Sequence, residues 1–169
     1  ISAEMLGNTL EAFDITLEYL KERKQFGAVI GSFQALQHRA AVMFAEIELT
    51  KSSVMGALNA VDENSNDRSR FASLAKFKAG ETLHLVSSEA VQMHGGVGVT
   101  DEFDIGFFLK RSRVAEQIFG SSDYHLDRYA TLSEYWPFIY TLSPVKPLIG
   151  IASLFCLLVN MIFWSSLLF

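Results

Sequence analysis

Apolar side chains recur at steps of three and four along residues 2–22, which is the spacing of one buried face on an α-helix. The residues of this stripe are Leu6, Leu10, Phe13, Leu17 and Leu20. The pattern stops at Gly27 and Gly31, because glycine weakens a helix interior. We therefore predict a first helix over residues 2–22.

The same period returns after these glycines in two longer segments. The first ends in the polar run 62–67, and its apolar positions are Leu36, Ala40, Met43, Ile47, Val54, Leu58 and Val61. The second covers residues 68–93, and its stripe consists of Phe71, Leu74, Phe77, Leu85, Val86, Ala90 and Met93. Because the polar run supplies a residue suited to capping a helix N-terminus, we predict a loop there between two long helices.

Two shorter helices are predicted beyond the glycine-rich residues 95–98. The first starts with the apolar residues at 105 and 107–109, and its basic face is formed by Lys110, Arg111 and Arg113. The second covers residues 121–132. Alternation typical of a strand is absent, and short connections between long amphipathic helices make neighbouring helices antiparallel. The sequence thus predicts an all-α fold, an antiparallel up-and-down four-helix bundle over residues 1–132.

Composition narrows the class of protein. The 169-residue chain has a net charge of −5 and a pI near 5.3, which argues against nucleic-acid binding, because such proteins present a basic stripe. Its single cysteine, Cys156, allows no disulfide framework, so we expect a reducing, cytoplasmic compartment. No secretory signal is visible. Since the chain opens on Ile1 within an amphipathic pattern, we expect it to start inside a longer protein.

The glycine cluster is the strongest candidate for a functional turn. Gly95, Gly96 and Gly98 fall directly after a long amphipathic segment. They indicate either a glycine-rich helix stop or a turn that lets a ligand approach the main chain. Their spacing fits neither a Walker loop nor a complete dinucleotide fingerprint. The four histidines show no metal-ligand spacing, and no nucleophile elbow is present.

The residues of two sequence motifs resemble those of a known protein family. Residues 92–103, QMHGGVGVTDEF, followed by FLKRSRV at 108–114, closely resemble the C-terminal helical domain of the acyl-CoA dehydrogenases, which are FAD-dependent flavoenzymes. Upstream, ERKQFG at 22–27, then Ile30 and FQALQH at 33–38, is similar to that family's other signature. The resemblance covers about residues 1–130, and two ordered motifs are more specific than one.

The resemblance implies a cofactor shared across a subunit boundary. The positions that would meet a neighbouring subunit's FAD are Arg23, Gln25, Phe26 and Gln34. The loop under its adenosine-diphosphate portion would consist of Gln92, Met93, His94, Gly95 and Gly96. A guanidinium is a forked donor suited to phosphate, and paired glycines expose backbone N–H groups to an anion. Taken singly, these residues could instead be a solvated charge, surface amides, a core phenylalanine and a structural histidine.

The catalytic base of the family is replaced in this sequence. Many members place a glutamate in a Tyr-Glu-Gly-Thr segment, where it removes the acyl α-proton. Aligning the downstream motif puts Phe119, Gly120 and Ser121 over Glu-Gly-Thr, so no catalytic residue is assigned, and Ser121 joins the expected cofactor contacts. Other members carry the base on an earlier helix, which would lie upstream of Ile1. The nearby carboxylates Glu116 and Asp123 are interpreted as solvated helix charges.

Two functions from different classes follow. The leading one is the C-terminal domain of an acyl-CoA dehydrogenase that oxidises an acyl-CoA thioester and passes electrons to FAD and then to an acceptor. This fragment alone would be inactive. The alternative, motivated by Phe119, is a non-catalytic subunit that completes its partner's FAD site in a hetero-oligomer. Either reading implies a homo- or hetero-oligomer.

The end of the chain differs in composition from the bundle. Trp136 and the three prolines interrupt residues 133–147, so we interpret 133–146 as a linker. Residues 147–169 contain no charge, and as a helix they would span about 33 Å, enough for a hydrocarbon core of roughly 30 Å. The tail is a membrane anchor, a helix folded back on the bundle, or a non-native end from a shifted reading frame. The resemblance stops before it, which favours the non-native end.

Overall fold

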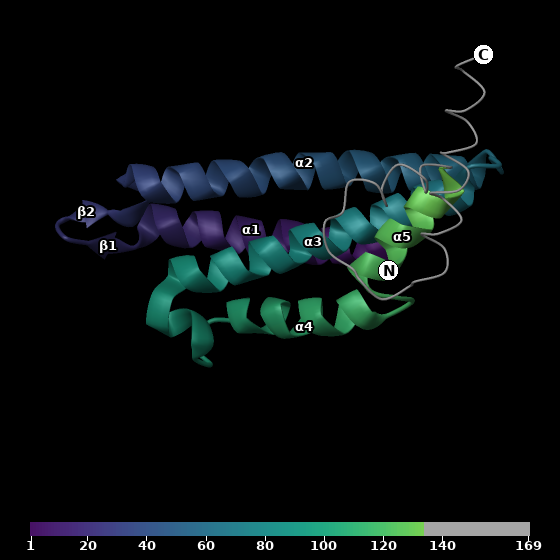
Figure 1. Cartoon of the computed structure of the whole chain (residues 1–169). Coiled ribbons are helices and arrows are strands. Elements are labelled where there is room, and N and C mark those ends of the chain that lie inside the picture. Colours follow the sequence, from purple (N-terminus) through teal and green to yellow (C-terminus); the bar gives the residue numbers. More distant parts are fainter. Residues whose placement is uncertain (134–169) are drawn as a thin grey trace, which may run out of the picture. The chain divides into compact units, whose positions relative to one another are not determined.

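The computed structural model describes residues 1–133 of the chain, and these form five α-helices (Figure 1). The helices are α1 (Ser2–Glu22), α2 (Gln34–Asp62), α3 (Arg68–His94), α4 (Ile105–Gln117) and α5 (Ser122–Leu132). Their bounds agree with the predicted segments to within a few residues. The all-α antiparallel bundle is therefore confirmed. The predicted linker and apolar tail lie outside the described residues and stay predictions.

Helix α3 is the central element of the bundle. It packs against α1, α2, α4 and α5, and small side chains along it let neighbouring backbones approach closely. The buried small residues of α3 are Ser73, Ala75, Ala79, Gly80, Ser87 and Ala90. A Cβ built at Gly80 would lie 2.7 Å from the Ser122 hydroxyl, so α5 can pack there because position 80 has no side chain.

The predicted apolar stripes form only part of the core, because Met5 and Leu83, which belong to no predicted stripe, are fully buried, whereas several stripe positions of α1 and α3 are half-buried. The largest fully buried side chains of the core include Met5, Met43, Ile47, Leu83 and Ile105. Two positions assigned to the buried face of α2 differ, since Leu58 and Val61 are 47% and 58% exposed. Helix α2 has 29 residues and α1 has 21. Because α2 is longer, its last turns extend beyond the end of α1 and are not covered by it. Among the described helices, none combines the length and apolarity needed to cross a membrane.

A short hairpin between α1 and α2 departs from the expectation of no strands. β1 (Lys24–Gln25) pairs antiparallel with β2 (Ala28–Val29), and a 3-10 turn, η1 (Ile30–Ser32), leads into α2. The two turn residues have positive φ, 53° at Phe26 and 78° at Gly27. Strands of two residues are too short to show the alternation on which the sequence argument rested.

Candidate functional site

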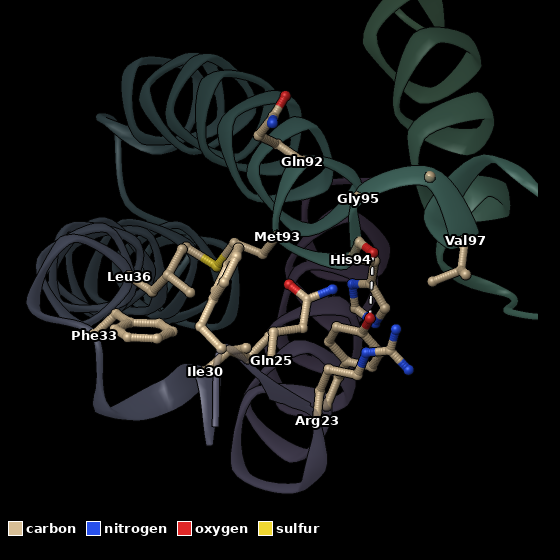
Figure 2. Close-up of a pocket in the computed structure, with 13 residues that line it drawn as sticks. Arg23, Gln25, Ile30, Phe33, Leu36, Gln92, Met93, His94, Gly95 and Val97 are labelled. Carbon is tan, nitrogen blue, oxygen red and sulfur yellow. Dashed lines mark hydrogen bonds between the residues drawn. The ribbon is translucent and has the colours of Figure 1, made fainter. Parts of the chain in front are cut away.

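A cavity of about 440 Å³ opens where the C-terminal ends of α1 and α3 meet the hairpin and the start of α2 (Figure 2). Its lining unites the two sequence motifs, which are separated by about seventy residues in the chain. The predicted site residues on its wall are Arg23, Gln25, Phe26, Gln92, Met93, His94, Gly95 and Gly96. The structure thus brings eight of the ten predicted cofactor contacts together.

The hairpin holds the first motif at the mouth of the cavity. Arg23 ends α1, its N–H donating to the Tyr19 carbonyl, and its own carbonyl accepts from the N–H of Ile30 at 2.8 Å. The side chains of Arg23 and Gln25 are exposed. Phe26 is 93% exposed, with its ring edge-on to Phe33 at 6.4 Å between centroids. The interpretation of Phe26 as a core residue is therefore wrong.

The glycines at the end of α3 have two roles: one ends the helix, and another allows close packing of the following loop against the last turn of α3. Gly95 terminates the helix at φ 67°, a conformation that favours glycine, and its N–H donates to the carbonyls of Val91 and Gln92. Gly98 packs against the preceding turn, where an added Cβ would lie 2.9 Å from the Val91 carbonyl oxygen. Gly96 has open space around it, so the main chain there can be approached from the cavity.

His94 is a buried support of this loop and 4% exposed. Its Nδ1 lies 2.7 Å from the Ala90 carbonyl oxygen, and its ring stacks on Tyr19 at 4.2 Å between centroids. The Tyr19 hydroxyl in turn donates to the His94 carbonyl at 3.3 Å, the dashed line in Figure 2. Burial lowers the pKa of His94, and the Ala90 bond opposes this only in part. His94 therefore supports the wall as a neutral ring that packs, and it brings no positive charge.

Arg23 is the cation of the cavity. Within residues 1–133 its guanidinium makes no hydrogen bond or ion pair that would occupy it, which leaves its donors free for a ligand. Figure 2 shows the side chains of Arg23 and Gln25 directed to the same side of the hollow as His94, while Gln92 stands at the rim and points away from them. Met93 is buried beside Leu36 and supplies apolar wall. The arrangement suits a ligand that carries an anionic group beside an apolar portion.

A second hollow of about 380 Å³ adjoins the first and shares Tyr19 and Arg23 with it. Its wall also carries Glu18 and Glu22. Arg23 therefore stands at the boundary between an acidic surface and the uncharged wall formed by the end of α3. An anionic ligand would be repelled by the acidic side and directed toward the first cavity.

Two predicted contacts, Gln34 and Ser121, do not line the cavity. Gln34 is exposed at the first position of α2. Ser121 lies at the opposite end of α4, where its hydroxyl accepts from the Tyr124 N–H at 3.3 Å and caps α5. Their role in cofactor binding stays a prediction. Phe119, at the position expected for the base, is 80% exposed with φ 63°.

The turn that presents Phe119 is held by side chains that sequence reasoning missed. Lys76 is 2% exposed and donates to the carbonyls of Glu116 and Gly120 at 2.9 and 3.0 Å. His125 Nε2 lies 3.0 Å from the Phe119 carbonyl oxygen, and Nδ1 lies 3.4 Å from the Ser73 hydroxyl. The sequence did contain a signal for Lys76, because it stands three residues after Ser73 and four before Gly80, on the buried face of α3. Burial lowers the pKa of Lys76 and of His125.

The comparisons with known proteins match the same part of the chain. The family model described as "Acyl-CoA dehydrogenase, C-terminal domain" matches residues 1–131. The acyl-CoA dehydrogenase IpdE2 of Mycolicibacterium smegmatis is 39% identical over 120 residues, which is 71% of this chain and 37% of that protein.

Solved structures give the same result. The Tcur3481-Tcur3483 steroid ACAD G363A variant superposes with a TM-score of 0.76 at 32% identity, over 80% of this chain and 37% of that one. An FAD complex of PigA matches with a TM-score of 0.74 at 25% identity, over 79% and 34%. The ChsE4-ChsE5 complex from Mycobacterium tuberculosis matches with a TM-score of 0.73 at 26% identity, over 85% and 37%. The chain spans little more than a third of the length of these proteins.

Proposed function

The chain belongs to the acyl-CoA dehydrogenase family through that family's C-terminal domain, and on this premise we propose that it is the helical bundle of an FAD-dependent acyl-CoA dehydrogenase. The longer protein would oxidise the Cα–Cβ bond of an acyl-CoA thioester and pass the electrons through FAD to an acceptor. The observation that carries the proposal is the cavity in which the hairpin and the end of α3 meet. We propose that it binds the adenosine-diphosphate part of FAD.

The residues of the cavity fit that part of the cofactor. The Arg23 guanidinium is exposed and available to a pyrophosphate, for which a planar, permanently charged fork is well suited. Gln25 and Gln92 offer amide donors and acceptors for ribose or adenine, and the open main chain at Gly96 admits close approach of a phosphate. The cavity is a hollow on the surface of one bundle, which agrees with a cofactor held between subunits. When bound, FAD supplies the hydride acceptor.

Binding and orientation are what this chain contributes to the reaction. Proton abstraction from the acyl α-carbon needs a base, and Phe119 has none to offer. Of the carboxylates beside it, Asp123 is exposed in the first turn of α5, and Glu116 is half-buried in the last turns of α4. The base would therefore come from a part of the longer protein outside this chain.

A second function is favoured by the same phenylalanine. A subunit that lacks the base could complete the FAD site of a competent partner, and the similarity to a chain of the ChsE4-ChsE5 complex supports such a hetero-oligomer. An anaerobic titration of the full-length homo-oligomer with acyl-CoA separates the two. Bleaching of the flavin band supports a competent enzyme, and bound flavin that no acyl-CoA reduces supports the partner function.

Substitution of Arg23, the cationic residue of the cavity, tests the proposed cofactor site. In the full-length protein, Arg23→Ala removes a charge-assisted bond worth about 1.5–3 kcal/mol, so FAD should dissociate roughly ten- to a hundredfold more readily. Lys21→Ala, at an exposed position in the same turn of α1, is the matched control. Equal retention of FAD by both variants through gel filtration would show that Arg23 does not meet the cofactor.

A further inference from the structure

The turn between α4 and α5 has a strained backbone. Phe119 and Gly120 both have positive φ, 63° and 112°, and a side chain as bulky as phenylalanine rarely adopts this conformation. The Phe119 ring is 80% exposed, so its burial does not offset the strain. Such a conformation persists only where the surrounding structure imposes it. The bonds that this turn makes with α3 and α5 therefore set the backbone of Phe119.

His125 of α5 supplies one of these bonds, and its surroundings fix the position of its proton. Nε2 lies 3.0 Å from the Phe119 carbonyl oxygen, and Nδ1 lies 3.4 Å from the Ser73 hydroxyl. That hydroxyl accepts a hydrogen bond from the Arg128 guanidinium at 2.6 Å. Because a guanidinium can only donate, the Ser73 hydroxyl keeps its own proton for Nδ1. His125 is thereby held as the neutral tautomer that donates from Nε2 to the turn.

The charges around His125 oppose its protonation. The ring is 9% exposed, and the cations that act on it are Lys76 of α3 and Arg128 of α5. A proton on Nδ1 would add a third positive charge to this buried cluster and would require the Ser73 hydroxyl to turn away. Burial and the two cations accordingly lower the pKa of His125, and the bond to the Phe119 carbonyl opposes this only in part.

The acidic side chains near this cluster do not pair with it. Burial lowers the pKa of Lys76, and the charge of Glu116 on α4 opposes this effect. Asp123 and Asp127 of α5 are exposed. Within residues 1–133, none of these three carboxylates forms an ion pair with a cation of the cluster. A proton taken up by His125 would therefore have no carboxylate partner there.

We propose that His125 makes the α4–α5 turn an acid-sensitive switch, which is closed while the ring is neutral and opens when Nδ1 takes up a proton. A group whose pKa is lowered in the closed state binds a proton more readily when the turn is open, so acid favours opening. The closed state is complete above about pH 6.5 and weakens as the pH falls further. The switch is independent of the cofactor proposal, because the turn follows the end of α4 that is remote from the cavity.

Amide hydrogen exchange in the 169-residue chain tests the switch. The Gly120 N–H donates to the Gln117 carbonyl at 3.3 Å, so its protection reports whether the turn is closed. Between about pH 7.5 and pH 5.5, the Gly120 protection factor should fall by up to about tenfold, the limit for one proton bound at an ordinary pKa of 6.5. The amide of Ile47, which is buried in α2, reports global unfolding. Equal losses at Gly120 and Ile47, or no loss at Gly120, would overturn the proposal.

Substitution of the ring separates the switch from other titrating groups. His125→Gln keeps a donor for the Phe119 carbonyl but takes up no proton, so the protection of Gly120 should become independent of pH over this range. His38→Gln, at an exposed position of α2, is the matched control and should keep the dependence of the parent. A His125→Gln variant that keeps the parental pH dependence would show that another group controls the turn.

Nuclear magnetic resonance of the imidazole nitrogens tests the ring in the unaltered chain. At about pH 7.5 the spectrum should show His125 with its proton on Nε2. On acidification, His125 should titrate at a lower pH than the exposed His38. A proton on Nδ1 in the neutral ring, or a His125 that titrates with or above His38, would contradict the geometry on which the switch depends.

Discussion

The ammonium of Lys76 donates a hydrogen bond to the main-chain carbonyl of Gly120 across 44 residues of sequence, with Nζ 3.0 Å from the oxygen. A second bond, to the Glu116 carbonyl, completes the attachment of the α4–α5 turn to α3. Lysine is rarely buried to this degree unless its ammonium is satisfied. The position of the α4–α5 turn, and with it that of Phe119, therefore depends on a buried side chain of α3.

Replacing Lys76 should destabilise the bundle. Lys76→Met keeps the length of the side chain but leaves two partly buried carbonyl groups without this donor, so the free energy of unfolding should fall by about 1.5–3 kcal/mol. Urea denaturation measures it, with Lys21→Met at an exposed position of α1 as the control. Equal midpoints for the two variants would mean that the Lys76 bonds add nothing to stability.

The bundle should lose stability in mild acid. Burial lowers the pKa of His94 and of His125 below their ordinary value of 6.5. The unfolded chain then binds more protons than the folded chain below about pH 6.5, so stability is complete above that pH and falls as the pH drops further. Thermal unfolding between about pH 7.5 and pH 5.5 measures the effect. His94→Phe should reduce it, whereas an unchanged pH profile would exclude His94 as a source.

Two glycines should respond to alanine in opposite directions. An added Cβ at Gly31 would lie 2.7 Å from the Leu20 carbonyl oxygen, which is backbone and cannot move freely, so Gly31→Ala should destabilise by about 1–3 kcal/mol. At Gly7 within α1 nothing lies within 4 Å, so Gly7→Ala should stabilise by about 0.5–1 kcal/mol. Equilibrium unfolding of both variants tests the close approach of η1 to α1.

Replacing Phe26 with asparagine should maintain or increase the stability of the bundle. It occupies the first central position of a two-residue turn at φ 53°, where asparagine before glycine is strongly preferred. Because the ring is 93% exposed, Phe26→Asn forfeits almost no burial, and the melting temperature should rise or stay level. If the full-length variant also loses FAD, the phenylalanine serves the ligand. A clear fall in melting temperature would contradict the turn geometry described above.

The bundle should fold without the end of the chain. Contacts within Ile1–Ser133 form one compact unit, so a chain ended after Leu132 should keep its helical circular dichroism and a cooperative melting transition. Comparing its soluble and membrane fractions with those of the longer chain tests the predicted tail. Loss of helicity on truncation would show that residues beyond 132 belong to the core.

The sequence by itself determined the helices and the identity of the motif residues. The period of Leu6 to Leu20 places α1 within one residue of its observed bounds, because helical burial is a local pattern with contacts three and four residues apart. Gly95 likewise ends α3 for a local reason, because glycine readily adopts the positive φ found at this position. The motifs around Arg23 and His94 named eight of the residues that line the cavity.

Only the tertiary structure decided what those residues do. The cavity exists because α1 and α3 end side by side, which juxtaposes Arg23 with Gly96 through packing that no local pattern encodes. Tertiary packing also buries His94 and Lys76, and it leaves Phe26 exposed. Each outcome depends on which neighbour covers a given face of a helix. Spacing along the chain predicts that a face is buried or polar, but the partner across it is set by the assembled bundle.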